Sequence, residues 1–264
     1  MQIGSSNNTE AVKAQYATSK GLSTRINFHD KYSTNQQGFG NWIVSNYDIK
    51  EGAKVLELGC GTGSTWLGHK ETIAKCGKLI LTDFSEGMLE TTKETLRDYK
   101  GIEYKQADIQ DLPFEDDSFD VVIANMMLYH VPDIDKAMKE VRRVLKDDGV
   151  FYCATFGEHN FTDCLAEWFN LSGEKFNPNH NFTLQNGEEK LRTAFSLVMA
   201  LVYEDTLKIT DTDDLIDYLL SLASLKAIND IPTQKIKEIL SEHEVNGEIV
   251  LPKEYGMFIA KGNK

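Results

Sequence analysis

Val55-Leu56-Glu57-Leu58-Gly59-Cys60-Gly61-Thr62-Gly63 is the stretch that decides the fold of this 264-residue chain. Its apolar first half predicts a buried strand. Its three alternate glycines predict a sharp turn that comes close to a ligand, because glycine has no Cβ to collide with it. A helix expected to begin near Ser64 would direct unpaired N–H groups at a ligand held in that turn. The pattern therefore predicts a strand–turn–helix unit that cradles a nucleotide.

The spacing of the glycines separates two classes of nucleotide. The dinucleotide fingerprint places glycines at relative positions one, three and six. Here Gly59, Gly61 and Gly63 take positions one, three and five, and Ser64 takes position six. Glu57 ends the strand, where a carboxylate suits an ammonium or sulfonium better than a pyrophosphate. The stretch favours a cationic nucleoside ligand, although a glycine turn alone is also common in ordinary loops.

Strands and helices are expected to alternate after this turn. Further apolar segments predict strands over 78–83, 102–107, 119–125 and 150–155. Ser85 and Asp133 are expected to cap the helices before the third and fifth strands, and Gly101 and Gly149 to end them. This alternation predicts a doubly wound, mostly parallel sheet that binds its ligand beyond the carboxyl ends of the strands.

Polar side chains stand where four of these strands end. Glu57, Asp83, Asp108 and Asn125 would all lie on the ligand-binding edge. Asp83 follows Gly63 by 20 residues, about where a ribose-binding acid belongs in a βαβ unit. We expect one carboxylate there to accept hydrogen bonds from two ribose hydroxyls.

Five short motifs keep a common order and approximate spacing over residues 50–156. They are Glu57 to Gly63; Asp83-Phe84-Ser85 with Met88; Ala107-Asp108-Ile109; Leu112-Pro113-Phe114 with Ser118-Phe119-Asp120; and Leu128-Tyr129-His130-Val131-Pro132. Together they resemble the class I S-adenosylmethionine-dependent methyltransferases. Several motifs in register are more specific than one glycine loop.

The resemblance implies S-adenosylmethionine as cofactor and assigns parts of it to residues. The glycine turn and Glu57 would hold the methionine end, Asp83 the ribose hydroxyls, and Met88, Asp108 and Ile109 the adenine. Asn125 would lie near the methionine end through its backbone. The whole expected cofactor-binding set is Arg25, Glu57, Gly59, Cys60, Gly61, Gly63, Asp83, Phe84, Met88, Ala107, Asp108, Ile109 and Asn125.

The fold class expected from these observations is α/β, a Rossmann-like doubly wound sheet with helical cap segments. The family fold adds a C-terminal antiparallel strand pair, for which 197–209 and 255–261 are the candidates. We expect an N-terminal helical cap or lid over 1–50. The methyltransferase domain is expected over 51–264, with helical insertions at about 157–195 and 211–250.

The segment 16–47 is rich in aromatic residues and precedes the first strand. In many small-molecule methyltransferases this region folds over the cofactor, which the segment resembles. Arg25 would then pair with the cofactor carboxylate, and Tyr32 would line the methyl-transfer pocket. The equally weighted alternative is that Arg25 is a surface charge and the aromatic residues pack a helical cap.

Methyl transfer from a sulfonium is an in-line displacement that depends on positioning and exclusion of water. A base is useful only for some acceptors. His130 is the leading candidate, with Tyr129 beside it, because both follow the fourth strand near the expected methyl position. The favoured alternative is that His130 ties the turn before Val131-Pro132-Asp133 to the next helix.

Composition limits the partners. The formal net charge is −13 at pH 7 and the pI is about 4.9. This acidity repels nucleic-acid phosphates and anionic lipid, and no basic aromatic stripe offsets it. We therefore expect a small-molecule substrate rather than nucleic acid or a membrane, and the sequence does not define the oligomeric state.

Apolar runs, cysteine spacing and one acidic run predict the compartment and whether the chain binds a metal. Residues 1–9 lack the apolar core of a secretion signal, and the longest apolar run, 195–203, is too short to span a bilayer. A cytoplasmic location is expected. The four cysteines show no metal or redox spacing and should be reduced thiols. The acidic run 115–117 predicts a solvated turn, so no metal site is expected.

The sequence therefore predicts a methyltransferase that uses S-adenosylmethionine and acts on a small molecule. Two alternatives stay open. One is a non-catalytic, regulatory protein that binds S-adenosylmethionine. The other, disfavoured by the glycine spacing and Glu57, is an NAD-dependent oxidoreductase.

Overall fold

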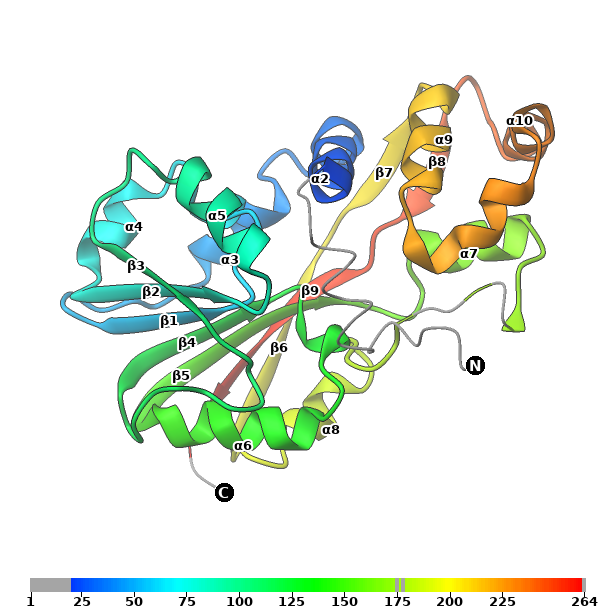
Figure 1. Cartoon of the computed structure of the whole chain (residues 1–264). Helices are drawn as coiled ribbons and strands as arrows, with labels where there is room; N and C mark the ends of the chain where they lie inside the picture. Colours follow the sequence, from blue (N-terminus) through cyan, green and yellow to red (C-terminus); the bar gives the residue numbers. More distant parts are fainter. Residues whose placement is uncertain (1–19, 174–175, 177–178, 263–264) are drawn as a thin grey trace.

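A seven-stranded sheet forms the centre of the molecule in the computed structural model, which describes residues 20–173, 176 and 179–262 (Figure 1). The strand order is β3-β2-β1-β4-β5-β9-β6. The strands are β1 Lys54–Leu58, β2 Lys78–Asp83, β3 Ile102–Gln106, β4 Phe119–Asn125, β5 Leu145–Phe156, β6 Leu197–Tyr203 and β9 Tyr255–Lys261. The first five pair in parallel, and β9 pairs antiparallel with both β5 and β6. The chain order reverses at β1 and β4, so their carboxyl ends form the switch point where such sheets bind ligands.

Helices cover both faces of this sheet, as Figure 1 shows. One face packs against α3 Phe39–Ser45, α4 Lys70–Lys75 and α5 Glu86–Thr95, and the other against α6 Ile134–Val144 and α8 Gly187–Leu191. Neighbouring residues of β1 point to opposite faces: Val55 belongs to the first core and Leu56 to the second, and both are fully buried. Burial on both faces explains why these strands are almost continuously apolar in the sequence.

A second body, here called the helical lobe, stands beside the sheet at the upper right of Figure 1. It consists of α2 Lys20–Tyr32, α7 Phe161–Trp168, α9 Thr212–Leu220, η4 Ala223–Asp230, α10 Thr233–Ser241 and the antiparallel strands β7 Thr206–Ile209 and β8 Ile249–Pro252. These elements share a separate hydrophobic core. The strands of the lobe continue from strands of the sheet through two short connections, β6 to β7 and β8 to β9.

The predicted alternation of strands and helices is confirmed, and so are both predicted helix caps. The Ser85 side chain accepts a hydrogen bond from the Met88 backbone N–H at 3.3 Å, and Asp133 accepts one from Lys136 at 2.9 Å. The C-terminal antiparallel pair is confirmed as β9 with β6. The expected division at residue 50 stays a prediction, and residues 1–19 lie outside the described part of the chain.

The helix expected to begin near Ser64 is wrong in length. Only the single 3-10 turn η1 Ser64–Trp66 begins there, and the α-helix α4 begins at Lys70. Leu67 is extended and Gly68 has a φ of +82°, so the backbone leaves the helical region for these two residues. Glycine adopts such a left-handed angle without steric cost, which makes Gly68 a natural break.

Three further expectations need correction. Gly101 does not end the helix that Ser85 caps, because α5 already ends at Thr95 with Leu96 as its C-cap. Gly149 does not end a helix: α6 already ends at Val144, because Leu145 is extended, and Gly149 lies inside β5. Residues 197–209 do not form one strand. The chain leaves the large sheet at Glu204 and Asp205, so that β6 and β7 belong to different sheets.

Candidate functional site

The chain turns sharply after β1, as its glycines predicted. Gly59, Gly61 and Gly63 have φ values of +70°, +57° and +75°, all in the left-handed region that other residues enter at a cost. The turn is closed by a hydrogen bond of 2.9 Å from the Gly63 N–H to the Cys60 carbonyl oxygen. The Cys60 N–H donates to the Thr82 carbonyl oxygen at 2.8 Å, which fastens the turn to β2.

Close packing is a second reason for glycine in this turn. A Cβ on Gly63 would lie 2.8 Å from Cγ2 of Thr92 in α5 and 3.2 Å from Cδ1 of Leu96, the C-cap residue of that helix. A Cβ on Gly59 would lie 2.9 Å from Met127 Cγ. The turn therefore lies against α5 and the loop after β4 with no room for larger residues.

Glu57 is enclosed by protein rather than open to a ligand on all sides. Its carboxylate accepts a hydrogen bond from Trp66 Nε1 at 2.7 Å and a longer one from Asn125 Nδ2 at 3.4 Å. Only 2% of the residue is exposed, and this burial raises the pKa of Glu57 to about 7. The two hydrogen bonds lower that pKa and so limit the rise. The sequence did not reveal Trp66 as a partner, because a tryptophan in the first turn after a glycine loop has no distinctive pattern.

The Asn125 side chain lies beside Glu57, whereas the expectation concerned only its backbone and stays a prediction. Its amide Nδ2 donates to the Tyr47 hydroxyl at 2.7 Å, while its Oδ1 is buried without a hydrogen-bond partner. An orphaned buried acceptor is costly and is expected to have an occupant. Asn125 Oδ1 and the Glu57 carboxylate together fit an ammonium group such as that of the methionine end of S-adenosylmethionine.

The backbone beyond Asn125 is unusual. Met126 has a φ of +52°, although it is not glycine, and its N–H donates to the Ala154 carbonyl oxygen at 2.8 Å. Such angles in larger residues cost about 1–3 kcal/mol and gather at functional sites. Met126 therefore has a costly backbone conformation directly after β4, at the carboxyl edge of the sheet.

Asp83 lies at the end of β2, next to the glycine turn. One carboxylate oxygen accepts the Gly61 N–H at 2.9 Å, and the other accepts the Ser85 N–H at 2.8 Å. Burial raises the pKa of Asp83, and these backbone hydrogen bonds oppose the rise. Each oxygen keeps a further lone pair, which leaves the carboxylate able to accept from ribose hydroxyls.

The residues expected around the adenine lie next along the edge. β2 pairs with β3, which places Asp83 opposite Gln106 and brings Asp108 and Ile109 to its neighbourhood. Met88 and Ile109 are buried, and Asp108 accepts the Gln110 N–H at 2.8 Å. The remaining members of the set are half-buried or buried within the same turn and strand ends: Cys60, Phe84 and Ala107. Their contacts with a cofactor stay predictions.

Tyr129 and His130 lie on the 3-10 turn η2 Leu128–His130, directly after β4. Their ring centroids are 4.5 Å apart, and Tyr129 also packs on Phe156 at 4.7 Å. His130 Nδ1 lies 3.4 Å from the Asn179 amide nitrogen. The structure therefore brings both residues to the edge that carries Asn125, where their catalytic role stays a prediction.

Arg25 and Tyr32 lie on α2 and contact α9 and the turn after it. The Tyr32 hydroxyl donates to Asp214 at 2.6 Å, and the residue is 4% exposed. An Arg25 guanidinium nitrogen donates to the Ser221 carbonyl oxygen at 3.2 Å. These contacts tie α2 into the helical lobe. Roles for either residue at the cofactor or the methyl group stay predictions.

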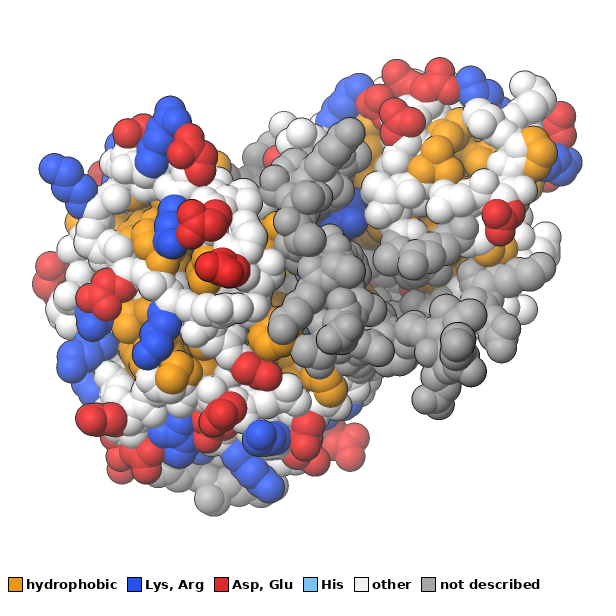
Figure 2. All heavy atoms as spheres, in the orientation of Figure 1, with side chains coloured by type: hydrophobic (Ala, Val, Ile, Leu, Met, Phe, Trp, Pro, Cys, Tyr) orange, Lys and Arg blue, Asp and Glu red, His pale blue; other side chains and the backbone are white. Residues whose placement is uncertain are grey.

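The described surface carries charges of both signs, and the cysteines are free thiols. Acidic and basic side chains are intermixed over the described part of the face in Figure 2. Cys60, Cys76, Cys153 and Cys164 are all free thiols. In the described ranges, no set of three or more histidine, cysteine or acidic side chains is arranged to hold a metal ion. Among these same residues, no helix has both the length and the apolar character needed to cross a membrane.

Comparison with known proteins agrees with this geometry. The family model of the methyltransferase domain matches residues 56–153, from the middle of β1 to the middle of β5. A demethylmenaquinone methyltransferase of Staphylococcus saprophyticus is 36% identical over 130 residues, which is 48% of this chain and 56% of that protein. The enzyme of the same name from Staphylococcus carnosus is 35% identical over 111 residues, 42% of this chain and 46% of that protein. The chain thus spans about half the length of the curated relatives it matches.

Crystal structures show the fold over more of the chain. The cyclase SpnF matches with a TM-score of 0.60 at 18% identity and covers 97% of both chains. A putative methyltransferase of Bacillus halodurans matches with a TM-score of 0.59 at 16% identity, over 86% of this chain and 99% of the other. YcgJ of Bacillus subtilis matches with a TM-score of 0.58 at 19% identity, over 85% of this chain and 98% of the other. At these identities the likeness shows the fold alone.

Proposed function

We propose, from the premise that this chain carries a methyltransferase domain of the class I fold, that it transfers a methyl group from S-adenosylmethionine to a small-molecule acceptor. The observation that carries this proposal is the edge formed by β1, β2 and β4. There a left-handed glycine turn, the Asp83 carboxylate and an orphaned amide oxygen beside a buried acid lie together. Few other ligands need all three at once.

The residues of this edge would hold the cofactor in parts. Asp83 would accept from the ribose hydroxyls, Met88 and Ile109 would enclose the adenine, and Glu57 with Asn125 would receive the ammonium. When bound, the cofactor supplies an electrophilic methyl group on a sulfonium. The protein has to align the acceptor with that methyl group and exclude water.

Tyr129 and His130 are the proposed catalytic residues. They stand at the end of β4, where an acceptor must approach, and His130 would accept a proton if the acceptor needs activation. Tyr32 is kept as a further proposed pocket residue. The family match covers residues 56–153 and includes no element of the helical lobe, so we assign the acceptor only as a small molecule.

The cofactor is tested first, by thermal denaturation of the protein with S-adenosylhomocysteine or with NAD. We expect stabilisation by S-adenosylhomocysteine at concentrations above its Kd and none by NAD, because binding to the native state alone raises its stability. Stabilisation by NAD and not by S-adenosylhomocysteine would reverse the assignment.

Transfer is tested separately, because the same fold occurs in a protein described as a cyclase. Labelled S-adenosylmethionine is incubated with panels of amine, phenol, thiol and activated-carbon acceptors. His130→Ala should slow single-turnover transfer by about a hundredfold or more if His130 is a base. The exposed His159→Ala serves as the matched control and should leave the rate unchanged. Tight cofactor binding without transfer to any acceptor class would favour the non-catalytic binding protein.

A further inference from the structure

The two outermost strands of the seven-stranded sheet carry very different side chains. The sheet is bordered by β3 on one side and by β6 on the other. β3 exposes Glu103, Lys105 and Gln106, the kind of charged and polar residues that keep a free strand from pairing with another chain. β6 reads Leu-Val-Met-Ala-Leu-Val-Tyr and has no charged residue, glycine or proline. The outer side of β6 therefore lacks this protection.

Several apolar side chains of β6 are open to solvent. The exposed fractions are 55% for Leu197, 49% for Met199 and 66% for Val202, and Ala200 is exposed as well. Single exposed apolar residues are ordinary on a protein surface, but several on one short strand form the kind of patch that marks an interaction site.

The backbone of β6 has one neighbouring strand. It pairs antiparallel with β9, and in the part of the chain that the structure describes no hydrogen bond joins the backbone of residues 197–202 to any other segment. The N–H and C=O groups on the side of β6 that faces away from β9, here called the β6 edge, can therefore accept a further strand.

A second copy of β6 fits the β6 edge in one register. Symmetric dimers use the same patch of both subunits, so the patch must be complementary to itself. An antiparallel pair with its two-fold axis at Ala200 matches all 7 residues of each strand, and a shifted register leaves residues at the ends unmatched. The matched pairs are Leu197 with Tyr203, Val198 with Val202, Met199 with Leu201, and Ala200 with its own copy.

The two ends of β6 also differ in charge. At the first end, an Arg192 guanidinium nitrogen donates to the carbonyl oxygen of the residue before the strand at 3.4 Å, while another binds Glu188 at 2.8 Å. Lys261 of β9 pairs with Leu197 and adds a second positive charge there. At the other end, the exposed Glu204 directly follows the strand. Antiparallel pairing would bring the basic end of each copy against the acidic end of the other, twice over.

We propose that two copies of this chain associate through the β6 edge, as antiparallel strands around a two-fold axis at Ala200, so that their sheets join into one. A second copy suits the edge better than an unrelated strand, because its side chains and its end charges are complementary to themselves. β5 and β9 lie between β4 and β6 in the sheet, so this surface is separate from the proposed cofactor site.

Ala200 provides a test of the axis itself. Ala200→Lys would set two lysines directly opposite each other, and Ala200→Glu two glutamates. Like charges in opposite positions destabilise a strand pair, and unlike charges stabilise it. An equal mixture of the two variants sets lysine opposite glutamate. Ala74→Lys and Ala74→Glu are the matched controls, because Ala74 is an exposed residue of α4, outside β6.

Sedimentation velocity of the full chain over a range of concentrations measures the dimer Kd. We expect the wild-type protein to form dimers and each Ala200 variant to dimerise more weakly. The mixture of Ala200→Lys and Ala200→Glu should dimerise about tenfold or more tightly than either variant alone. The Ala74 variants should behave like the wild-type protein, and mixing them should change nothing.

Two results would overturn the proposal. One is a wild-type protein that stays monomeric up to about 0.1 mM, a range in which even a weak specific dimer is populated. The other is a mixture of the Ala200 variants that dimerises no better than its components, because a contact elsewhere on the surface would not respond to charge at this position. Circular dichroism of each variant reports whether it folds.

A further measurement needs no variant. Hydrogen exchange of the wild-type protein is compared at concentrations below and above the dimer Kd. We expect the amides of β6 to exchange more slowly in the dimer, because the β6 edge is then hydrogen-bonded to the other copy. Slower exchange in other elements and unchanged exchange in β6 would contradict the proposal even if both Ala200 variants failed to fold.

Discussion

Asp83 has two structural duties besides its proposed contact with ribose. Its oxygens accept the N–H groups of Gly61 and Ser85, so removal of the whole carboxylate would also loosen the glycine turn. Asp83→Asn keeps one acceptor oxygen and is the sharper test. We expect it to weaken binding of S-adenosylhomocysteine by about 1.5–3 kcal/mol, roughly tenfold to a hundredfold in Kd, the value of a hydrogen bond to a charged group.

Titration calorimetry measures that change. The matched control is Asp98→Asn, because the Asp98 side chain is 80% exposed and lies after α5, away from the turn. Unchanged affinity in Asp83→Asn would remove the ribose role from this residue.

Glu57 makes the stability of the ligand-free protein depend on pH. Its pKa is about 7 in the native state and about 4.3 in an unfolded chain, so between these values the native state holds a proton that the unfolded state has lost. The free energy of unfolding therefore decreases as pH rises through this window, by up to about 4 kcal/mol. Below the unfolded pKa this contribution is fully present, and above pH 7 it is gone.

Glu57→Gln should remove part of that decrease. Urea denaturation at pH 5, 6, 7 and 8 should show a fall in the free energy of unfolding that is about 1–3 kcal/mol smaller than in the wild-type protein. The exposed Glu51→Gln should follow the wild-type curve. Parallel curves for Glu57→Gln and wild type would mean that Glu57 is already ionised in the native state.

The turn between β1 and α4 depends on glycine for two separable reasons, a left-handed backbone and close packing. Gly52, which precedes β1, serves as the comparison. Gly52 and Gly63 have nearly the same φ, +78° and +75°, but a Cβ on Gly52 would meet nothing within 4 Å. A Cβ on Gly63 would press on Thr92 and Leu96. The pair therefore separates the cost of a left-handed backbone from the cost of close packing.

We expect Gly52→Ala to destabilise the protein by about 1–2 kcal/mol, the cost of the left-handed region. Gly63→Ala should cost about 1–3 kcal/mol more, because α5 has to move, and should also weaken binding of S-adenosylhomocysteine. Chemical denaturation and calorimetry measure both effects. Equal costs for the two variants would show that α5 yields freely to the added methyl group.

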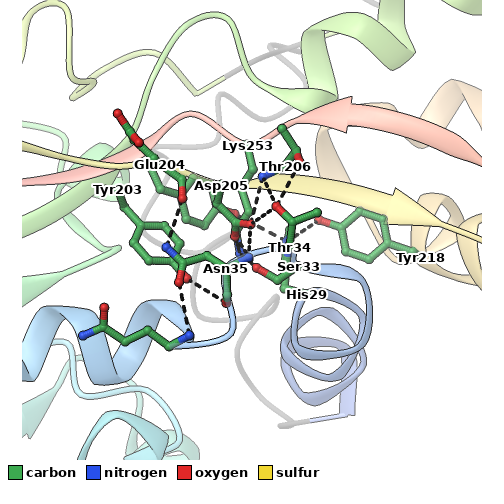
Figure 3. A network of polar contacts seen from close by, with 12 residues as sticks. His29, Ser33, Thr34, Asn35, Tyr203, Glu204, Asp205, Thr206, Tyr218 and Lys253 are labelled. Carbon is green, nitrogen blue, oxygen red and sulfur yellow. Dashed lines mark hydrogen bonds and ion pairs between the residues drawn. The ribbon is translucent and has the colours of Figure 1, made fainter.

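In the molecule as a whole, the β6–β7 and β8–β9 connections are fastened to each other. Lys253, in the β8–β9 connection, and Asp205, in the β6–β7 connection, form an ion pair of 2.8 Å with side chains 2% and 0% exposed. Ser33, which follows α2, hydrogen-bonds to both partners, and the Asn35 N–H donates to Asp205 at 2.9 Å (Figure 3). Three segments far apart in the chain thus meet at one buried pair.

Removing one charge of this pair should lower the free energy of unfolding more than removing both charges. Asp205→Asn leaves Lys253 buried and unpaired, and we expect a loss of about 3–5 kcal/mol in the free energy of unfolding. In a Lys253→Met background the same substitution should cost at least about 1 kcal/mol less, because no charge is then left alone. Denaturation of the four proteins of this cycle measures the coupling.

An exposed ion pair serves as the control for the buried Asp205–Lys253 pair. Lys235 and Glu238 form an ion pair of 3.1 Å whose side chains are about half exposed. Glu238→Gln should change stability by less than about 1 kcal/mol. Strict additivity across the Asp205 and Lys253 cycle would show that the buried pair does not fasten the two connections.

The sequence by itself determined the features that depend on neighbouring residues. Strands β2, β4 and β9 have the predicted bounds, Ser85 and Asp133 cap the predicted helices, and the three glycines have the left-handed angles that the turn requires. Period, capping and glycine geometry are local, so they can be seen in a single chain. The order of the polar strand ends then placed the acids and Asn125 on one edge, since parallel strands end together.

Tertiary structure alone decided which side chains those residues meet. Glu57 accepts hydrogen bonds from Trp66 and Asn125, and the Asn125 amide also donates to Tyr47. Asp205 pairs with Lys253, which is 48 positions further along the chain. Such partners are selected by burial and by the need to satisfy each polar group out of water. That selection depends on how distant segments pack, and no local pattern encodes it.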